Sequence, residues 1–237
     1  MSVDNSFKLK LFFFLRKIGG NRLPTSIKKP FGNYLIYDKD GSSLQDKRRE
    51  FIASLVEQTI NSNIEGEIME CGIAKGETTI CIAKKLKELN SKKIIYGVDA
   101  FDTFPFDDND RPFEKRKLLQ KKYAKVSGTP WYSLEEVQEN VDKNNLDNVK
   151  LVKGLVEDVL PSFSTKKFSF AMVDVDSYVA TKQCLDFFKP HMSKGGIIFL
   201  DDYNNPSWAG AKKAADEVLG REKIIPLKFE QAYFINN

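Results

Sequence analysis

The chain has 237 residues, 41% of them hydrophobic and 30% charged. This suits one domain, or one domain with an added arm, that buries about three quarters of its unfolded surface. No apolar run approaches the roughly 20 residues of a membrane-spanning helix, and three cysteines without a CxxC spacing argue against a disulfide framework or a zinc site. We therefore expect a reducing, cytoplasmic location.

The net charge of +4 is unevenly distributed along the chain. Residues 1–30 carry seven basic side chains and one acid, a net charge of +6, so the remainder carries −2. A slightly acidic body is not typical of a nucleic-acid-binding protein, so we expect no nucleic-acid partner. We interpret residues 1–30 as a basic amphipathic arm and linker, and residues 31–237 as the globular domain.

The arm carries apolar side chains at helical spacing, at Phe7, Leu11, Phe14, Leu15 and Ile18. Two interpretations remain open for residues 1–20. They dock on the domain or on a second subunit of a homo-oligomer, or they rest on an anionic membrane surface as a peripheral contact. Glycines and prolines between residues 19 and 30 then form a linker.

Residues 66–86 form the segment around which the domain is organised. A short apolar run ends at Glu70, glycines follow at Gly72 and Gly76, and a helical pattern continues to residue 86, after a covering helix over residues 51–60. The spacing E-x-G-x-x-x-G differs from the G-x-G-x-x-G of dinucleotide folds. It favours S-adenosylmethionine, whose amino group can bind a carboxylate and whose adenosyl group can pack on a bare turn. A strand–loop–helix corner without a ligand is the alternative.

Asp99 ends a second predicted strand, which spans residues 93–98. A carboxylate at this position can accept hydrogen bonds from both hydroxyls of a ribose. Asp99 lies 27 residues after Gly72, whereas an NAD-binding fingerprint places its acid about 20 residues on. Both details favour a methyl donor over a dinucleotide, although an acid that merely ends a strand is common.

The rest of the chain predicts further strand–helix units after one unusual segment. Residues 100–132 mix aromatics, prolines and charges, with one helix over 113–123, and predict a lid or substrate-recognition insertion. A capping box at Ser133 and Glu136 opens the next helix, which runs to about residue 144. Strands are then predicted at 149–153, 168–173, 196–200, 223–227 and 231–235, with helices at 179–189 and 208–219. This pattern predicts an α/β fold, a doubly wound, Rossmann-like seven-stranded sheet.

Four carboxylates follow the predicted strands four and five: Asp174, Asp176, Asp201 and Asp202. They would repel one another in a shared crevice unless a cation were bound. Hard oxygen ligands without nearby His or Cys favour Mg²⁺, with Mn²⁺ as the alternative. In the other interpretation some of these acids cap helices or face solvent. The single histidine, His191, precedes strand five at the opposite edge of the sheet, so we do not expect it to be catalytic.

Several motifs together resemble the macrocin O-methyltransferase family, over about residues 35–235. They are ECGIAKGETT, VDAFDTFP, GLVEDVLP, DVDSYVATKQCLDFFKPHMSKGGIIFLDDY and WAGAKKAADEV. The resemblance implies a class I methyltransferase fold and Mg²⁺-dependent methyl transfer from S-adenosylmethionine to a sugar hydroxyl. It also implies a metal triad at Asp174, Asp201 and Asp202, with Asp176 as the general base.

We expect the methyl donor to be bound by residues that follow the first three strands: Glu70, Cys71, Gly72, Gly76, Thr78, Asp99, Ala100 and Gly154. The expected acceptor is a sugar of a glycan, a glycolipid or a glycosylated metabolite. One alternative is a nucleotide-sugar glycosyltransferase that uses the Asp-Val-Asp motif to bind its metal, although the glycine turn and Asp99 argue against it. The other is a non-catalytic binding protein on the same fold.

Overall fold

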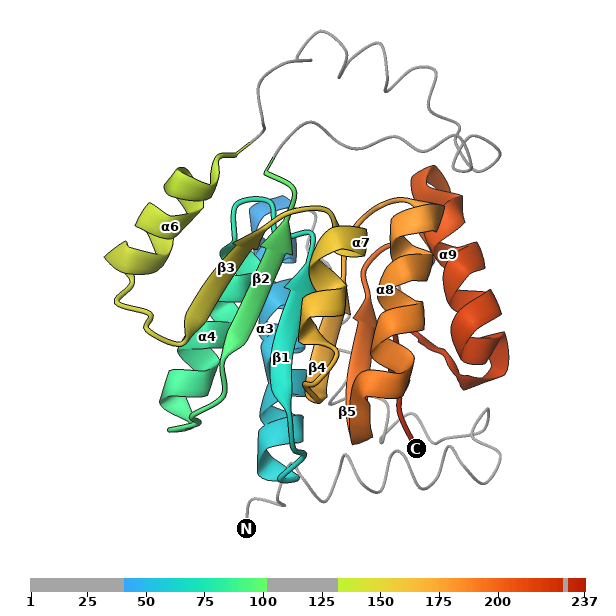
Figure 1. Ribbon diagram of the computed structural model, residues 1–237, viewed down its shortest axis with the longest axis horizontal. Helices are drawn as coiled ribbons and strands as arrows, with labels where there is room; N and C mark the ends of the chain where they lie inside the picture. Colours follow the sequence, from blue (N-terminus) through green and yellow to red (C-terminus); the bar gives the residue numbers. More distant parts are fainter. Residues whose placement is uncertain (1–40, 102–131, 228–229) are drawn as a thin grey trace, which may run out of the picture. The chain divides into compact units, whose positions relative to one another are not determined.

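The computed structural model describes residues 41–101, 132–227 and 230–237 (Figure 1). The chain divides into two compact units, Met1–Phe51 and Ile52–Asn237, and the second contains the sheet. The predicted arm and linker, their boundary at residue 30, and the helix expected at 113–123 lie outside the described residues. Within the described ranges, no helix combines the length and the apolar character needed to cross a bilayer.

The described helices and strands follow one another as α3 (Gly41–Asn61), β1 (Glu67–Cys71), α4 (Glu77–Glu88), β2 (Ile95–Asp99), α6 (Leu134–Lys143), β3 (Val149–Lys153), α7 (Val156–Val159), η5 (Leu160–Phe163), β4 (Phe168–Val173), α8 (Tyr178–His191), β5 (Met192–Leu200), η6 (Pro206–Trp208), α9 (Ala209–Ala215), the π-helical turn η7 (Asp216–Gly220), η8 (Arg221–Lys223), β6 (Ile225–Pro226) and β7 (Ala232–Ile235).

The strands form one seven-stranded sheet in the order β3-β2-β1-β4-β5-β7-β6, which confirms the predicted fold. Strands β1 to β5 pair in parallel, and β7 pairs antiparallel with both β5 and β6. The strand order reverses between β1 and β4. Open sheets bind their ligands beyond the carboxyl ends of the strands at such a reversal, so this edge is where a site is expected.

Helices cover both faces of the sheet, with α7 and α8 on one face and α4 on the other (Figure 1). Strand β4, with the sequence FSFAMV, is buried at every position, as expected for a central parallel strand covered on both faces. Successive side chains of a strand point to opposite faces of the sheet, and those of β1 thus contact different helices. Cys71 belongs to the core formed with α8, whereas Glu70 contacts Thr79 of α4.

Local signals place several element boundaries correctly. The predicted capping box is confirmed: the backbone N–H of Glu136 donates to Ser133 Oγ at 3.1 Å, and the N–H of Ser133 donates to Glu136 Oε2 at 2.8 Å. Ser177 caps α8 by accepting a hydrogen bond from the N–H of Ala180 at 3.1 Å. The structure differs at β5, which begins at Met192 and not at residue 196, and at 155–163, where two unpredicted helical turns lie. Those turns are too short to show a helical period.

Candidate active site

The loop between β1 and α4 packs directly against the loop that follows β4. Gly72 has a φ of 85°, and a Cβ there would lie 1.9 Å from the carbonyl oxygen of Asp174. The N–H of Asp174 donates to the carbonyl of Cys71 at 2.9 Å. Glycine is therefore required at position 72 by its own backbone conformation and by the neighbouring loop. Gly76, with a φ of 74°, is the N-cap residue directly before α4.

Glu70 is buried at the end of β1, and the hydroxyl of Thr79 donates a hydrogen bond to its carboxylate. A buried carboxylate needs such a partner, because removal from water is costly for a charged group. Thr78, in the first turn of α4, is also buried. Thr79 was not among the site residues predicted from the sequence; it is buried on the face of α4 that packs against the sheet.

Asp99 braces the loop that follows β1. Its Oδ2 accepts hydrogen bonds from the backbone N–H groups of Ile73 at 2.9 Å and Ala74 at 3.0 Å, and its Oδ1 accepts from Phe101 at 2.8 Å. A carboxylate offers about four lone-pair sites, so this arrangement leaves Asp99 little further accepting capacity. Its role therefore includes holding the glycine loop, in addition to any contact with a ribose.

Three other predicted donor-binding residues have distinct surroundings. The Cys71 thiol lies in the core, where a hydrogen bond with Cys184 and burial raise its pKa well above the usual value. Its backbone carbonyl accepts the hydrogen bond from the N–H of Asp174. None of the three cysteines forms a disulfide. The N–H of Gly154 donates to the carbonyl of Asp99 at 2.9 Å, and a Cβ there would lie 2.6 Å from Val159 Cγ2. Ala100 is half-buried beside Asp99.

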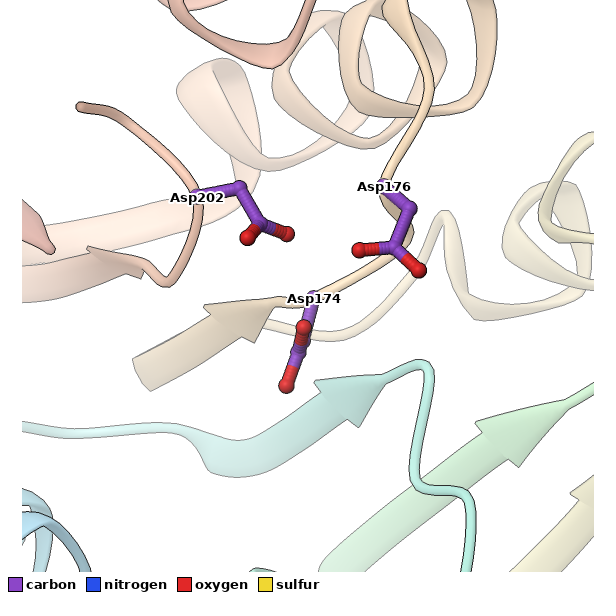
Figure 2. A group of neighbouring side chains, drawn as sticks. All are labelled: Asp174, Asp176 and Asp202. Atoms are coloured by element: carbon purple, nitrogen blue, oxygen red, sulfur yellow. The ribbon is translucent and has the colours of Figure 1, made fainter. Parts of the chain in front are cut away.

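Three carboxylates converge beyond the ends of β4 and β5, namely those of Asp174, Asp176 and Asp202. One oxygen of each lies within 4.8 Å of the others. Figure 2 shows Asp176 and Asp202 facing each other across a gap, with Asp174 beside them at the end of β4. The predicted metal triad was Asp174, Asp201 and Asp202, so the closest trio contains Asp176 in place of Asp201.

Asp201 nevertheless borders the same site. It lines, with Asp176 and Asp202, a small, partly open cavity of about 10 Å³. That volume is close to the smallest space that holds one water-sized species. Three of the four predicted carboxylates thus line this small space, whereas Asp174 is joined to the cluster by its proximity to Asp176 and Asp202.

Asp202 shows the electrostatic cost of this arrangement. Burial, as the largest cause, and the neighbouring carboxylates of Asp176 and Asp201 together raise its pKa to about 9, and a hydrogen bond from Asn205 opposes this shift. Its Oδ2 is buried and accepts no hydrogen bond from an N–H or hydroxyl group of the described residues. A divalent cation would satisfy that oxygen and remove the repulsion, so the residues present fit a hard metal ion.

The backbone around Asp176 explains how it reaches the cluster. Its φ of 61° is in the left-handed region, which is uncommon for a residue other than glycine. The following N–H, of Ser177, donates to the carbonyl of Val175 at 2.7 Å, which tightens the turn before α8. The turn directs the carboxylate of Asp176 back over the strand end.

Two residues that the sequence analysis missed support the segment after β5. The hydroxyl of Tyr203 donates to Asp216 Oδ1 at 2.6 Å, and the ammonium of Lys212 lies 3.6 Å from the centroid of the Tyr203 ring. Burial and the hydrogen bond to Asp216 raise the pKa of Tyr203, so this residue remains a hydrogen-bond donor. Asn205, the second residue, contacts Asp202 itself.

His191 lies at the opposite edge of the sheet, as predicted. It ends α8, immediately before β5, and its ring stacks on Phe187 with the centroids 4.4 Å apart. Nδ1 lies 2.7 Å from the carbonyl oxygen of Phe187, and Nε2 lies 3.1 Å from that of Ser164. These contacts give His191 a structural role.

The strand order, with the last strand inserted antiparallel between β5 and β6, is that of a class I methyltransferase. The chain belongs to the macrocin-O-methyltransferase (TylF) family, whose model matches residues 41–225, and it is therefore an O-methyltransferase. This membership selects methyl transfer over the glycosyltransferase that the Asp-Val-Asp motif left open.

Relatives of the chain agree with this assignment. It is 28% identical over 182 residues to mycinamicin III 3''-O-methyltransferase of Micromonospora griseorubida, and the match covers 75% of this chain and 70% of the relative. It is 26% identical over 160 residues to 8-demethyl-8-(2,3-dimethoxy-alpha-L-rhamnosyl)-tetracenomycin-C 4'-O-methyltransferase of Streptomyces olivaceus, covering 66% of this chain and 60% of the relative. The solved structure of the O-methyltransferase NovP has the same fold, with a TM-score of 0.68 and 23% identity over 80% of this chain and 79% of NovP.

Proposed function

We propose that the protein transfers the methyl group of S-adenosylmethionine to a hydroxyl group of a sugar-containing acceptor, assisted by Mg²⁺. The observation that carries the proposal is the packing of the glycine loop after β1 against the carboxylate-bearing loop after β4. A methyl donor in the first loop and an acceptor beside the carboxylates would lie next to each other. The tetracenomycin relative, whose name specifies a rhamnosyl group, supports a sugar acceptor.

The donor side is formed by the ends of β1, β2 and β3. Glu70 would bind the amino group of the donor, and the loop from Gly72 to Gly76 would pack against its adenosyl group. Asp99, whose carboxylate already orders Ile73 and Ala74, would bind the ribose with its remaining capacity. S-adenosylmethionine supplies an electrophilic methyl group on a sulfonium, so the protein needs to position an acceptor oxygen and remove its proton.

The acceptor side is formed by the four carboxylates. Asp174 and Asp202 would hold the cation, with Asp201 as a third ligand from the wall of the cavity that Asp202 also lines. A divalent cation bound there supplies Lewis-acid polarisation and a template for neighbouring hydroxyl groups. Asp176 would accept the proton of the reacting hydroxyl, because it reaches the same space from a turn outside β4.

The assignment can be tested with the purified full chain, S-adenosylmethionine and a panel of nucleotide sugars, glycolipids and glycosylated metabolites. Mass spectrometry should detect an acceptor heavier by one CH₂ group, and the product should disappear with EDTA and return with Mg²⁺. The matched control is Asp176→Asn, which should bind the donor while its turnover falls by about 10²–10⁴-fold. Tight binding of a UDP-sugar, with no binding of S-adenosylmethionine, would contradict the proposal.

We also infer that residues 1–20 provide a surface for a partner, on the basis of their charge and apolar stripe. The partner is a second subunit or an anionic membrane. Deleting residues 1–20 should leave donor affinity intact and change either the oligomer size in light scattering or the retention on anionic vesicles. If neither changes, this part of the proposal is wrong.

A further inference from the structure

We propose that Asn205 is a positioning residue of the carboxylate cluster, which holds one oxygen of Asp202 and leaves the other for a cation. The inference rests on the proposed metal site and adds a residue to it. Asn205 lies outside the predicted ligands and outside the strand, two residues after Tyr203. The inference is based on the contacts of its side chain with Asp202 and with Glu230.

The side-chain amide of Asn205 lies between two carboxylates. Its Nδ2 donates to Asp202 Oδ1 at 3.1 Å and to Glu230 Oε2 at 3.2 Å. A primary amide carries two hydrogens on nitrogen, so one group can serve both acceptors. An ionised carboxylate only accepts hydrogen bonds, so the amide nitrogen, and not its oxygen, faces these groups when a cation keeps Asp202 ionised.

This contact assigns different roles to the two oxygens of Asp202. Oδ1 is held by Asn205, whereas Oδ2 is buried and receives no N–H or hydroxyl donor from the described residues. Asp202 is only 7% exposed, so water does not compensate. A hydrogen bond on one oxygen fixes the rotation of the carboxylate, so the second oxygen is presented in a defined direction. Such outer contacts commonly control metal affinity.

The position of Asn205 is itself fixed from two directions. Its backbone N–H donates to the carbonyl of Asp202 at 3.1 Å, which closes a turn directly after β5. The N–H of the preceding Asn204 donates to the carbonyl of Glu230 at 2.6 Å, so the segment before β7 is joined to the same turn. Asn205 therefore connects the carboxylate at the end of β5 with the last strand of the sheet.

The test uses the full chain and measures metal affinity directly. Asn205→Leu keeps a similar volume and removes both donors, whereas Asn205→Gln keeps an amide on a longer side chain. Calorimetry with Mn²⁺ and with Mg²⁺ should show affinity reduced about 10- to 100-fold in the Leu variant, with partial recovery in the Gln variant. Saturating Mg²⁺ should restore most of kcat. Asn204→Ala, which changes the neighbouring and more exposed amide, should bind metal like the wild type.

Two further measurements keep the outcomes distinct. Affinity for S-adenosylmethionine should be unchanged in every variant, and the melting temperature in EDTA should show whether the Leu variant is folded. If that variant is destabilised yet binds metal normally, Asn205 is structural and the inference is wrong. If the wild type itself binds neither cation, the proposed metal site fails and this inference fails with it.

Discussion

The backbone at Gly72 and the backbone at Asp174 are so close that no side chain fits between them. A Cβ on Gly72 would approach the carbonyl oxygen of Asp174 to 1.9 Å, and the N–H of Asp174 donates to the residue before Gly72 at 2.9 Å. The loop proposed to bind the methyl donor and the loop that carries two of the carboxylates are therefore one packed unit. Displacing one loop must displace the other.

Replacing Gly72 by Ala should destabilise the protein more than replacing Gly76 by Ala. Both positions have positive φ, but only at Gly72 does the new Cβ meet backbone, which cannot rotate away. At Gly76 it meets Val137 Cγ1 at 2.8 Å, a side-chain atom that can shift. We expect a loss of at least about 3 kcal/mol for Gly72→Ala and about 1–2 kcal/mol for Gly76→Ala, measured by urea unfolding. Equal losses of stability would show that the backbone contact between Gly72 and Asp174 is not the reason for the cost at Gly72.

Replacing Asp99 by Ala should weaken both donor binding and folding. Three backbone N–H groups lose their acceptor, and each unsatisfied group costs roughly 1–3 kcal/mol where water cannot replace the carboxylate. Calorimetry should show reduced affinity for S-adenosylmethionine without added metal, and urea unfolding should show reduced stability. Loss of affinity alone, with stability unchanged, would mean that the bracing role is minor. The matched control is Asp147→Ala, which removes an exposed carboxylate outside the proposed site.

The two aspartates of the Asp-Val-Asp motif should respond differently to replacement by Asn. Asp174→Asn removes a proposed ligand, so Mg²⁺ affinity should fall and activity should recover partly at high metal. Asp176→Asn removes the proposed base but keeps the shape, so metal should still bind while turnover falls by about 10²–10⁴-fold. The opposite result would exchange the two roles, and Asp176 already lies in the closest trio of carboxylates. Full activity of both variants with a chelator present would exclude the metal altogether.

The stability of the metal-free protein should fall as pH rises. The folded state raises the pKa of Asp202 from 3.8 to about 9, so between these values it holds a proton that the unfolded chain releases. The free energy of unfolding then decreases with pH, by up to about 2–3 kcal/mol from pH 6 to pH 8, and has no such contribution below about pH 4. Asp202→Asn should lack this component, and Mg²⁺ should stabilise the wild type more at pH 8 than at pH 6. Parallel unfolding curves for the two proteins would contradict the assignment.

Local patterns predicted the strands and the edge where the site lies. Strands 149–153 and 168–173 were found with the predicted bounds. The second is a short apolar run and the first alternates apolar residues with Lys150, and both patterns are typical of strands. The acids at the strand ends then meet at one edge by topology alone. The short helical turns at 155–163 show no complete period and could not be predicted in this way.

Contacts between distant loops could not be predicted from spacing. The hydrogen bond between Glu70 and Thr79, the bracing of Ile73 by Asp99 and the contact between Asn205 and Asp202 all depend on the folded arrangement. The same applies to the trio of carboxylates, because the left-handed turn at Asp176 brings that side chain back to the cluster. Sequence indicates which residues reach the edge, whereas backbone geometry decides which of them touch.

The level pairing of the three central strands has a consequence for inhibitors. Cys71 of β1 pairs with Val173 of β4, and Val173 pairs with Leu200 of β5, so the three strands end side by side. Adjacent strands are about 4.8 Å apart, and the loops that follow these ends are thus separated by one or two such steps. A single compound that joins a donor analogue to a chelating sugar mimic would need only a short, rigid connection. The spacing of the strands sets the length of this connection. The same connecting unit should therefore suit compounds that carry different mimics of the acceptor sugar.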